Sequence, residues 1–233
     1  MITIIIPVYN EKKYIKTLLN KVIKLKGVKI QIIVVDDGSS DGSTEILKNE
    51  FVNNKKINKI IFHKKNSGKG SAIKSAQKYI EGKYVIIQDA DLEYNPRDII
   101  KIYKFISFKK YSAVYGSRVL NKNKYENTKN FTHLVRIWGN IFLTKISNII
   151  NNQNLTDAHT CYKAFDSKVF KEIKLMEDDF AFCPEITAKV SKLGYKIFEV
   201  PISYFGRNYS EGKKISFYDG IRAIFVLLKY RIS

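Results

Sequence analysis

Three acidic residues stand at alternate positions in the stretch YVIIQDADLE, at Asp89, Asp91 and Glu93. The run that begins at Tyr84 is apolar and rich in β-formers, which predicts a short buried strand leading into these acids. Asp89 and Asp91 would project to the same side if the backbone stayed extended. Paired carboxylates can bind Mg²⁺ or Mn²⁺, which in turn binds a diphosphate. A solvated acidic turn before a helix is the alternative, because Asp-x-Asp alone is a weak motif.

Alternating strand and helix patterns surround this acidic stretch and predict an α/β fold. Apolar β-rich runs predict strands at 2–6, 30–35, 59–63, from residue 84, at 112–115 and at 195–201, with 157–165 a loop that enters a further strand. Helical patterns are found at 11–26, 43–51, 70–81, 96–108, 132–150, 184–193 and 216–230. The alternation favours a mainly parallel, right-handed, Rossmann-like sheet flanked by helices. Open sheets of this kind bind ligands at the carboxyl ends of their strands, where the acids are expected.

The loops that follow the expected strands lack the common glycine-rich nucleotide motifs. The first loop reads PVYNE, without the Gly-x-Gly-x-x-Gly of dinucleotide folds. The segment Gly68-Lys69-Gly70 has neither the spacing nor the following Ser or Thr of a Walker loop. It is more simply a glycine turn before a helix.

Length and cysteine content favour one cytoplasmic domain. The chain has 233 residues, no internal repeat and no low-complexity linker, so one domain with a C-terminal elaboration is expected. No apolar run approaches the roughly 20 residues that a membrane-spanning helix needs. The opening MITIIIPVYN has no basic region and is not a signal peptide. Two cysteines, Cys161 and Cys183, make neither a disulfide framework nor a zinc site.

The formal net charge of +19 indicates an anionic partner such as a phosphorylated substrate or an anionic lipid. Nucleic acid is disfavoured, because no helix-turn-helix, RNP or zinc-finger pattern is present. The alternative is a general bias of the whole sequence towards lysine, since the lysines are spread along the chain.

Taken together, the loop sequences resemble the family 2 glycosyltransferases with the GT-A fold. The markers near the N-terminus are Pro7-Val8-Tyr9-Asn10-Glu11, Val34 through Ser39 and Asp89-Ala90-Asp91. The C-terminal half resembles a narrower group, the polyprenyl-phosphate hexose synthases typified by dolichyl-phosphate mannosyltransferase. Its markers are Gly116-Ser117-Arg118, Asp157 through Lys163, Glu199 through Tyr204 and Arg207 through Lys214. The resemblance implies a single GT-A domain with a nucleotide-sugar half at 1–118 and an acceptor-side half at 119–233, which ends in an amphipathic helix.

The resemblance also implies roles for particular residues. The positions that would hold the nucleotide are Pro7, Tyr9, Glu11, Val35 and Asp37. Asp89, Ala90 and Asp91 match the diphosphate and metal site, with Glu93 as a further carboxylate. Glu93 falls where the mannosyl synthases often have Gln, which leaves the donor sugar open. The positions that match phosphate contacts are Arg118, Arg207 and Lys213, for which ordinary surface charge is the alternative.

The implied reaction is inverting transfer of a hexose, mannose or glucose, from a nucleotide diphosphate sugar to a polyprenyl phosphate. Mg²⁺ or Mn²⁺ at Asp91 would stabilise the departing nucleotide. A phosphate acceptor is already an anion, so the demand for a general base is small. If one is used, Asp157 is the first candidate and Glu185 the second. A loop or cap aspartate, and an i, i+4 ion pair of Glu185 with Lys189, are the structural alternatives; His159 is a weak candidate.

Two other functions remain open on the sequence. A glycan or protein hydroxyl acceptor would make a base indispensable, and an inactive peripheral membrane or scaffold protein would retain the fold alone. The last helix contains AIFVLL at 223–228, flanked by Arg222, Lys229 and Arg231. Such a helix suits an anionic membrane surface, and packing against the sheet is the alternative. Family members often carry C-terminal membrane helices, whereas this sequence ends at Ser233 without one, so we expect a peripheral protein on the cytoplasmic face, with a possible membrane-anchored partner subunit.

Overall fold

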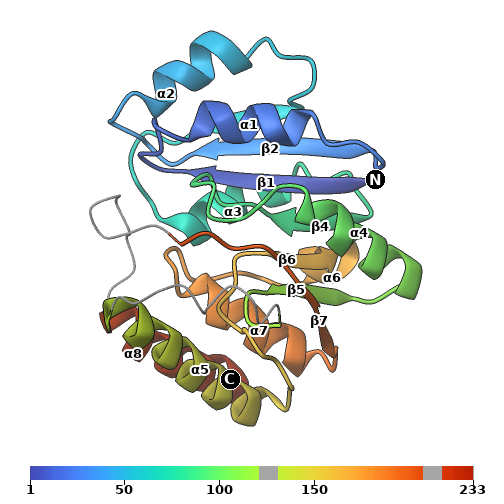
Figure 1. The fold of residues 1–233 in the computed structure, drawn as a ribbon, viewed down its shortest axis with the longest axis vertical. Helices are drawn as coiled ribbons and strands as arrows, with labels where there is room; N and C mark the ends of the chain where they lie inside the picture. The colour runs from blue at the N-terminus through green and yellow to red at the C-terminus, as the bar shows by residue number, and fades with distance from the viewer. Residues whose placement is uncertain (121–130, 207–216, 233) are drawn as a thin grey trace.

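A seven-stranded sheet in the order β3-β2-β1-β4-β6-β5-β7 runs through the molecule (Figure 1). The computed structural model describes residues 1–120, 131–206 and 217–232, without the side chains of 131–137 and 217–219. The strands are β1 (Ile2–Val8), β2 (Ile30–Asp36), β3 (Lys59–Phe62), β4 (Tyr84–Ile87), β5 (Ala113–Ser117), β6 (Lys163–Asp166) and β7 (Ile197–Pro201). Only β6 runs antiparallel to its neighbours, β4 and β5, in the described part of the chain. The expectation of a mainly parallel sheet is confirmed.

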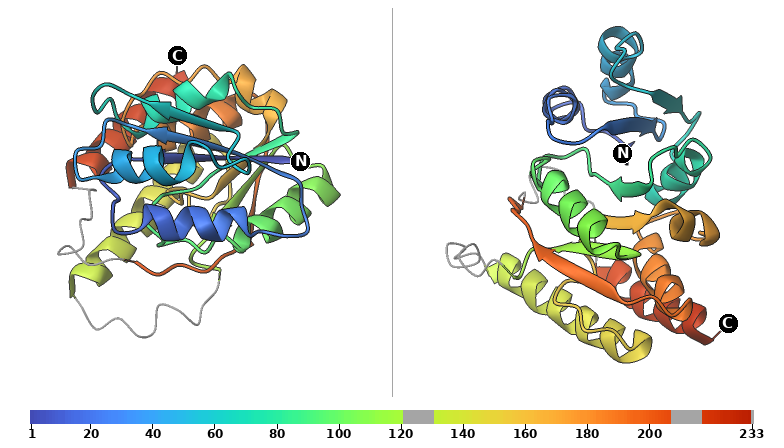
Figure 2. Two further views of the ribbon diagram at one scale, coloured as in Figure 1. Left: turned by 90° about the horizontal axis from the view of Figure 1, so that it is seen from above. Right: turned by 90° about the vertical axis from the view of Figure 1, so that its right-hand side faces the viewer.

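Helices cover both faces of the sheet and its β7 end. They are α1 (Ile15–Ile23), α2 (Ser43–Ile46) with a π-helical continuation η1 (Leu47–Phe51), α3 (Lys69–Gln77), α4 (Asp98–Lys109), α5 (Phe131–Asn151), α6 (Ser167–Glu172), α7 (Phe182–Lys192) and α8 (Phe217–Ile232). Figure 2 shows α1 and α4 on one face and α3, α6 and α7 on the other. Helices α5 and α8 lie beside one another below α7. The expected helices are present, with ends that differ by a few residues.

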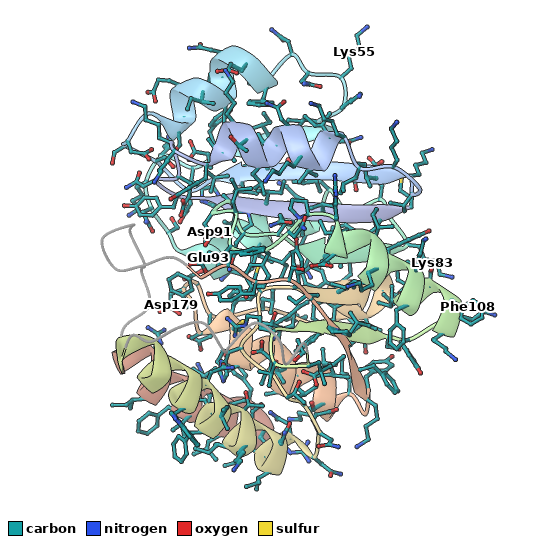
Figure 3. The ribbon with its side chains drawn as sticks, in the orientation of Figure 1. Lys55, Lys83, Asp91, Glu93, Phe108 and Asp179 are labelled. Carbon is teal, nitrogen blue, oxygen red and sulfur yellow. The ribbon has the colours of Figure 1, made fainter. Side chains whose placement is uncertain are left out.

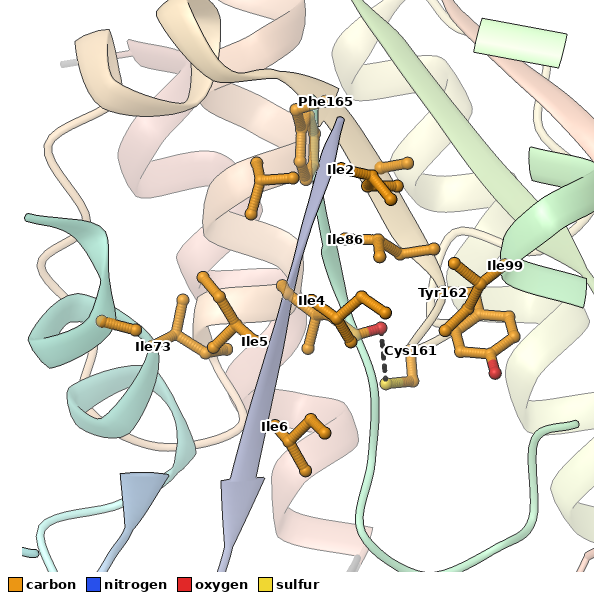
Figure 4. Packing of buried hydrophobic residues seen from close by; sticks show 14 of the residues in the cluster. Ile2, Ile4, Ile5, Ile6, Ile73, Ile86, Ile99, Cys161, Tyr162 and Phe165 are labelled. Atoms are coloured by element: carbon orange, nitrogen blue, oxygen red, sulfur yellow. Dashed lines mark hydrogen bonds between the residues drawn. The ribbon is translucent and has the colours of Figure 1, made fainter. Parts of the chain in front are cut away.

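The central strands are apolar along their whole length because both of their faces are buried. In β1 the side chains of Ile2, Ile4, Ile5 and Ile6 are completely buried (Figure 4). Strands β2 and β4 pair with β1 in parallel on its two sides. The carboxyl ends of β1, β2 and β4 therefore meet at one edge of the sheet. The loops that follow these three strands, with Tyr9, Asp37 and Asp89, lie at this edge.

The chain leaves the extended conformation just after β4, so the condition under which Asp89 and Asp91 would project to the same side is not met. Strand β4 ends at Ile87, two residues before Asp89. Leu92 adopts a positive φ of 60°, and the backbone N–H of Glu93 donates to the Asp91 carboxylate at 3.1 Å. These features form a tight turn, because a carboxylate that accepts from a backbone N–H two residues later stabilises a turn over a strand. Asp89 and Asp91 are thus placed by a turn and not by strand alternation.

The two halves expected at 1–118 and 119–233 share one sheet. Strand β6, from the second half, lies between β4 and β5 of the first. It leads directly into α6, a helix that the sequence reading missed, whose N-terminal cap is the Asp166 side chain accepting from the backbone of Lys168 at 2.9 Å. Across the described ranges no helix is both long and apolar enough to span a membrane.

Candidate active site

The loop after β1 is held against the loop after β2. The backbone N–H of Asn10 donates to the Ser39 hydroxyl at 3.0 Å, and that of Glu11 donates to the Ser43 hydroxyl at 2.9 Å. Asn10 takes a positive φ of 52°, a conformation that Asn tolerates better than most residues. The partly exposed Tyr9 is therefore presented on a fixed turn at the carboxyl edge of the sheet.

Asp37, directly after β2, organises the loop that begins α3. Its buried carboxylate accepts from the backbone N–H groups of Ser67 at 3.0 Å and Gly68 at 2.7 Å. It also bonds His63 Nδ1 at 2.6 Å, and the other ring nitrogen of His63 bonds the Ser75 hydroxyl at 2.8 Å. The sequence reading did not single out His63. This network fixes the start of α3 beside the tight turn that carries Asp89, Asp91 and Glu93, which we call the acidic turn.

Lys69, at the first position of α3, reaches the Asp89 carboxylate and forms a largely buried ion pair with it. Its ammonium also lies 3.8 Å from the Cys161 sulfur and 5.7 Å from the centre of the Phe182 ring. Burial disfavours the charged ammonium, but the Asp89 carboxylate outweighs it and raises the pKa of Lys69 above its usual value. Lys69 is therefore a permanent cation at the acidic turn.

The glycines around Lys69 are required by another segment of backbone. A Cβ atom at Gly70 would overlap the carbonyl of Glu177, and one at Gly68 would overlap that of Asp178. The backbone N–H of Ser71 donates to the same Asp178 carbonyl at 2.9 Å. Gly68 also has a positive φ of 97°, so the expected glycine turn before the helix is confirmed.

Asp89 and Asp91 offer the oxygen ligands that a hard divalent cation prefers. No group of three or more His, Cys, Asp or Glu side chains that could hold a metal converges within the described ranges. The donor set nevertheless fits Mg²⁺ or Mn²⁺ bound by one or two carboxylates, with substrate phosphates and water completing the shell. Glu93 lies next to Asp91 (Figure 3), but its carboxylate accepts from the Tyr204 hydroxyl at 2.7 Å.

A second polar centre joins the end of β5 and the middle of α5 to the 156–157 loop. Arg118 donates to the Asp157 carboxylate through Nε at 2.6 Å and Nη2 at 2.8 Å, a forked pair, and its backbone N–H donates at 3.1 Å. Asn140, on α5, adds a bond to Asp157 at 3.1 Å. Glu199, on β7, accepts from the backbone N–H groups of Asp157 at 2.9 Å and Thr156 at 2.7 Å. Asp157 is completely buried, so this geometry is fixed.

The electrostatics of this centre make Asp157 a weak base. Burial raises the pKa of Asp157, but the Arg118 guanidinium and the hydrogen bonds lower it further, to about 2. The Arg118 guanidinium also lies 5.0 Å from the centre of the Tyr204 ring. Because Tyr204 bonds Glu93, one tyrosine connects the acidic turn to the Arg118–Asp157 pair.

A completely buried lysine supports the loop that carries Asp157. The Lys163 ammonium donates to the Ala158 carbonyl at 2.6 Å and lies 3.7 Å from the centre of the Tyr115 ring. Burial lowers the pKa of Lys163. His159 Nε2 is buried and has no hydrogen-bond partner among the described residues. Burial and the charge of Lys163 lower the pKa of His159 to about 4, so this imidazole is neutral near pH 7.

Glu185, the second candidate base, is completely buried in the first turn of α7. Its carboxylate accepts from the backbone N–H groups of Met176 at 2.6 Å and Glu177 at 2.9 Å. The expected i, i+4 pair with Lys189 is present at 2.6 Å, with the acid buried instead of exposed. These contacts brace the 176–177 backbone that lies against α3.

The remaining residues named from the sequence fall into three groups. Val35 and Ala90 are buried, whereas Pro7 is partly exposed. Arg207 and Lys213 lie outside the described residues. Lys69 and Tyr204 are added by the structure. A lysine between two glycines, in the segment between the strand expected at 59–63 and the helix expected at 70–81, was the only signal for Lys69.

The sequence is similar to a known protein family and to individual proteins of other organisms. A family model described as "Glycosyl transferase family 2" matches residues 3–174. The chain is 33% identical over 238 residues to an uncharacterized protein of Methanocaldococcus jannaschii, covering 99% of this chain and 92% of that one. It is 31% identical over 252 residues to the UDP-N-acetylglucosamine–dolichyl-phosphate N-acetylglucosaminyltransferase of Methanococcus voltae, covering 100% and 97%.

A solved structure shares the fold. Glucosyl-3-phosphoglycerate synthase from Mycobacterium tuberculosis, in complex with Mn²⁺, UDP and phosphoglyceric acid, superposes with a TM-score of 0.71. The match covers 99% of this chain and 78% of that chain at 13% sequence identity.

Proposed function

Because the chain belongs to glycosyl transferase family 2 and has the GT-A fold, we propose that it transfers a hexose from a nucleotide diphosphate sugar to a polyprenyl phosphate, with inversion. Mannose and glucose are the proposed sugars. The relative from Methanococcus voltae, which is named for transfer of N-acetylglucosamine to dolichyl phosphate, supports the acceptor class and adds a third sugar to test.

The observation that carries the proposal is the forked ion pair between Arg118 and Asp157. A carboxylate with a pKa of about 2, held by a guanidinium, is poorly suited to remove a proton from a hydroxyl acceptor. A guanidinium fixed at the edge of the sheet suits the oxygens of a phosphate group. The centre is therefore better matched to an acceptor that is already ionised. In this reading Asp157 orients Arg118.

On the donor side, the residues proposed for the nucleotide sugar are Pro7, Tyr9, Glu11, Val35 and Asp37, with Asp89, Ala90 and Asp91 at its diphosphate. Lys69 neutralises Asp89 and would lie close to the diphosphate. Asp91, with Asp89, would hold Mg²⁺ or Mn²⁺, which supplies positive charge for the leaving nucleotide. The Mn²⁺ in the complex of the mycobacterial synthase supports this cofactor class. Arg207 and Lys213 remain proposed phosphate contacts.

The proposed setting is the cytoplasmic face of a membrane, where a polyprenyl phosphate presents its charged group. Peripheral attachment, or a membrane-anchored partner subunit, would bring the enzyme to it. Two rivals are kept as outcomes of the test: a glycan or protein hydroxyl acceptor, and a fold that binds without catalysis.

A donor and acceptor screen tests the proposal. Purified protein is incubated with Mn²⁺ and with UDP-glucose, UDP-N-acetylglucosamine or GDP-mannose, together with a short-chain polyprenyl phosphate or a sugar acceptor. We expect glycolipid from one donor and no product with the sugar acceptor. Product on the sugar acceptor alone would show that the enzyme uses a hydroxyl acceptor. Failure to bind any of the donors would favour the non-catalytic rival.

A further inference from the structure

Helices α5 and α8 pack side by side at the end of the molecule and both expose large apolar side chains (Figures 1 and 2). Phe142 is 60% exposed on α5, and Phe225 is 68% exposed on α8. Among the side chains that the structure describes, the exposed apolar ones are Trp138, Phe142 and Ile149 on α5 and Ile221, Phe225, Leu228 and Ile232 on α8. We call these residues the α5–α8 face. Exposed apolar residues are ordinary when scattered, but two adjacent rows indicate an interaction surface.

The spacing of these residues gives each helix one continuous stripe. At about 100° per residue, the positions in each row fall within about 60° of one another around the helix axis. The buried residues lie on the opposite side of each helix: Thr144, Ser147 and Asn151 on α5, and Ala223, Val226, Leu227 and Tyr230 on α8. Both stripes therefore point away from the protein core, and packing among the described residues leaves them exposed.

The charged residues around the α5–α8 face indicate which kind of partner it binds. Lys145 is exposed within the α5 stripe and Arg231 is exposed beside the α8 stripe. The sequence of α5 contains no acidic residue, and that of α8 contains one against three basic residues. Long basic side chains bordering an apolar stripe are typical of helices that lie in the interface of an anionic bilayer. Two copies of this face would bring like charges together, which disfavours self-association.

We propose that the α5–α8 face docks on an anionic lipid bilayer, with both helices lying along the membrane surface. Apolar side chains enter the boundary between headgroups and acyl chains, and cations contact lipid phosphates. This extends the sequence-based expectation, which concerned the last helix alone. Helix α8 packs against α5 and α7 through one side and presents the other side outward.

The face is close to the centre that we assign to the acceptor. Asn140, which bonds Asp157, is two residues from Trp138 on α5 and lies on the opposite side of the helix. A helix with its side chains is about 10–12 Å across, so the Arg118–Asp157 pair would sit about one helix thickness above the docking plane. This orientation rests on the proposed function; the docking itself does not.

Trp138 gives a direct readout, because it is the only tryptophan in the chain. We expect its fluorescence to shift to the blue when phosphatidylcholine vesicles containing about a third phosphatidylglycerol are added, and to be quenched by lipids brominated on their acyl chains. Pure phosphatidylcholine vesicles should give a weaker response, and added salt should weaken the anionic response, since exposed charges are screened within about 8 Å at physiological ionic strength.

Sedimentation with the same vesicles tests the face by mutation. The double variant Trp138→Ser, Phe225→Ser removes one aromatic residue from each stripe and should bind at least tenfold more weakly, because less apolar surface enters the bilayer. The matched control is Val52→Ser, Phe108→Ser, which removes two exposed apolar residues elsewhere and should bind like wild type. Lys145→Gln, Arg231→Gln should reduce binding to anionic vesicles only.

Two results would overturn the docking proposal. One is an unchanged Trp138 spectrum with the protein remaining in the supernatant at low salt. The other is concentration-dependent dimerisation that the double variant abolishes, which would make the face a contact between copies of the chain. Transfer to a water-soluble short-chain polyprenyl phosphate, measured in parallel without vesicles, keeps this outcome separate from failure of the proposed function.

Discussion

At the scale of single residues, the acidic turn is the feature that chemistry depends on most. Asp89 is neutralised by Lys69, so Asp91 carries the charge that a divalent cation would bind. We predict that Asp91→Asn lowers kcat by about 100-fold or more, roughly 3 kcal/mol of barrier, with the fold intact. Steady-state kinetics and circular dichroism check this. The control is Glu50→Gln, which alters a surface ion pair with Lys16 and should be nearly neutral.

Two results would contradict the proposal that a divalent cation takes part in the reaction. Near-normal turnover of Asp91→Asn, or full wild-type activity in an excess of chelator, would remove the cation from the reaction.

The buried Asp157 carboxylate makes a second prediction, on stability against pH. Its pKa is lowered from 3.8 to about 2 in the folded protein, so its ion pair contributes stability above about pH 4 and loses it as the pH falls towards 2. Asp157→Asn leaves Arg118 buried without its charge partner and should cost about 3–5 kcal/mol at neutral pH. Urea unfolding at several pH values should show this difference from wild type shrinking between pH 4 and 2. A difference that stays constant from pH 5 to pH 2 would contradict the assigned pKa.

The sequence could name Asp91 and Arg118 because each stands in a loop after a recognisable strand, and Asp157 because its loop enters one and matches a marker of the family resemblance. It could not pair them. Lys69 reaches Asp89 across 20 positions, and Tyr204 reaches Glu93 across 111. Such contacts depend on where the sheet brings the loops, and no local pattern encodes them.

At the scale of elements, the start of α3 is fixed by a crossing segment of backbone. We predict that Gly70→Ala destabilises the protein by about 1–3 kcal/mol, because the new methyl group overlaps the Glu177 carbonyl. Gly139→Ala is the matched control. Gly139 is helical with no atom within 4 Å of its added Cβ, so alanine there should stabilise by about 0.5–1 kcal/mol. Thermal unfolding of both variants is the measurement, and equal effects of the same sign would rule out the crossing as the cause.

Element types were predictable from the sequence and their ends were less so. The apolar runs that became β1, β2 and β4 are unambiguous because both faces of those strands are buried. Helix α4 begins two residues after Pro96, and α7 begins two residues before Pro184. Helix α6 was missed because its six residues, Ser167–Glu172, are too few for a helical period to show. The antiparallel insertion of β6 between β4 and β5 is a tertiary fact that its four residues do not reveal.

At the scale of the whole molecule, the last helix is bonded to the segment that lies against the start of α3, on the proposed donor side. Glu177 accepts hydrogen bonds from Arg222 at 3.0 Å, Lys229 at 2.9 Å and Tyr230 at 2.9 Å, all on α8. The backbone of the same residue lies against Gly70, next to Lys69. One short segment therefore connects the proposed membrane face to the acidic turn.

The central claim is that the acceptor is an anion held by Arg118, and comparison of two acceptors tests it most directly. We would measure kcat/KM for a polyprenyl phosphate and for the polyprenol of the same chain length, with wild type and with Arg118→Lys. Lysine keeps the charge but cannot form the forked pair with Asp157 that holds the Arg118 cation in place, and charge-assisted hydrogen bonds contribute about 1.5–3 kcal/mol. We predict transfer to the phosphate alone, reduced roughly 10- to 100-fold in Arg118→Lys. Transfer to the polyprenol at a comparable rate, with Arg118→Lys unaffected, would contradict the account.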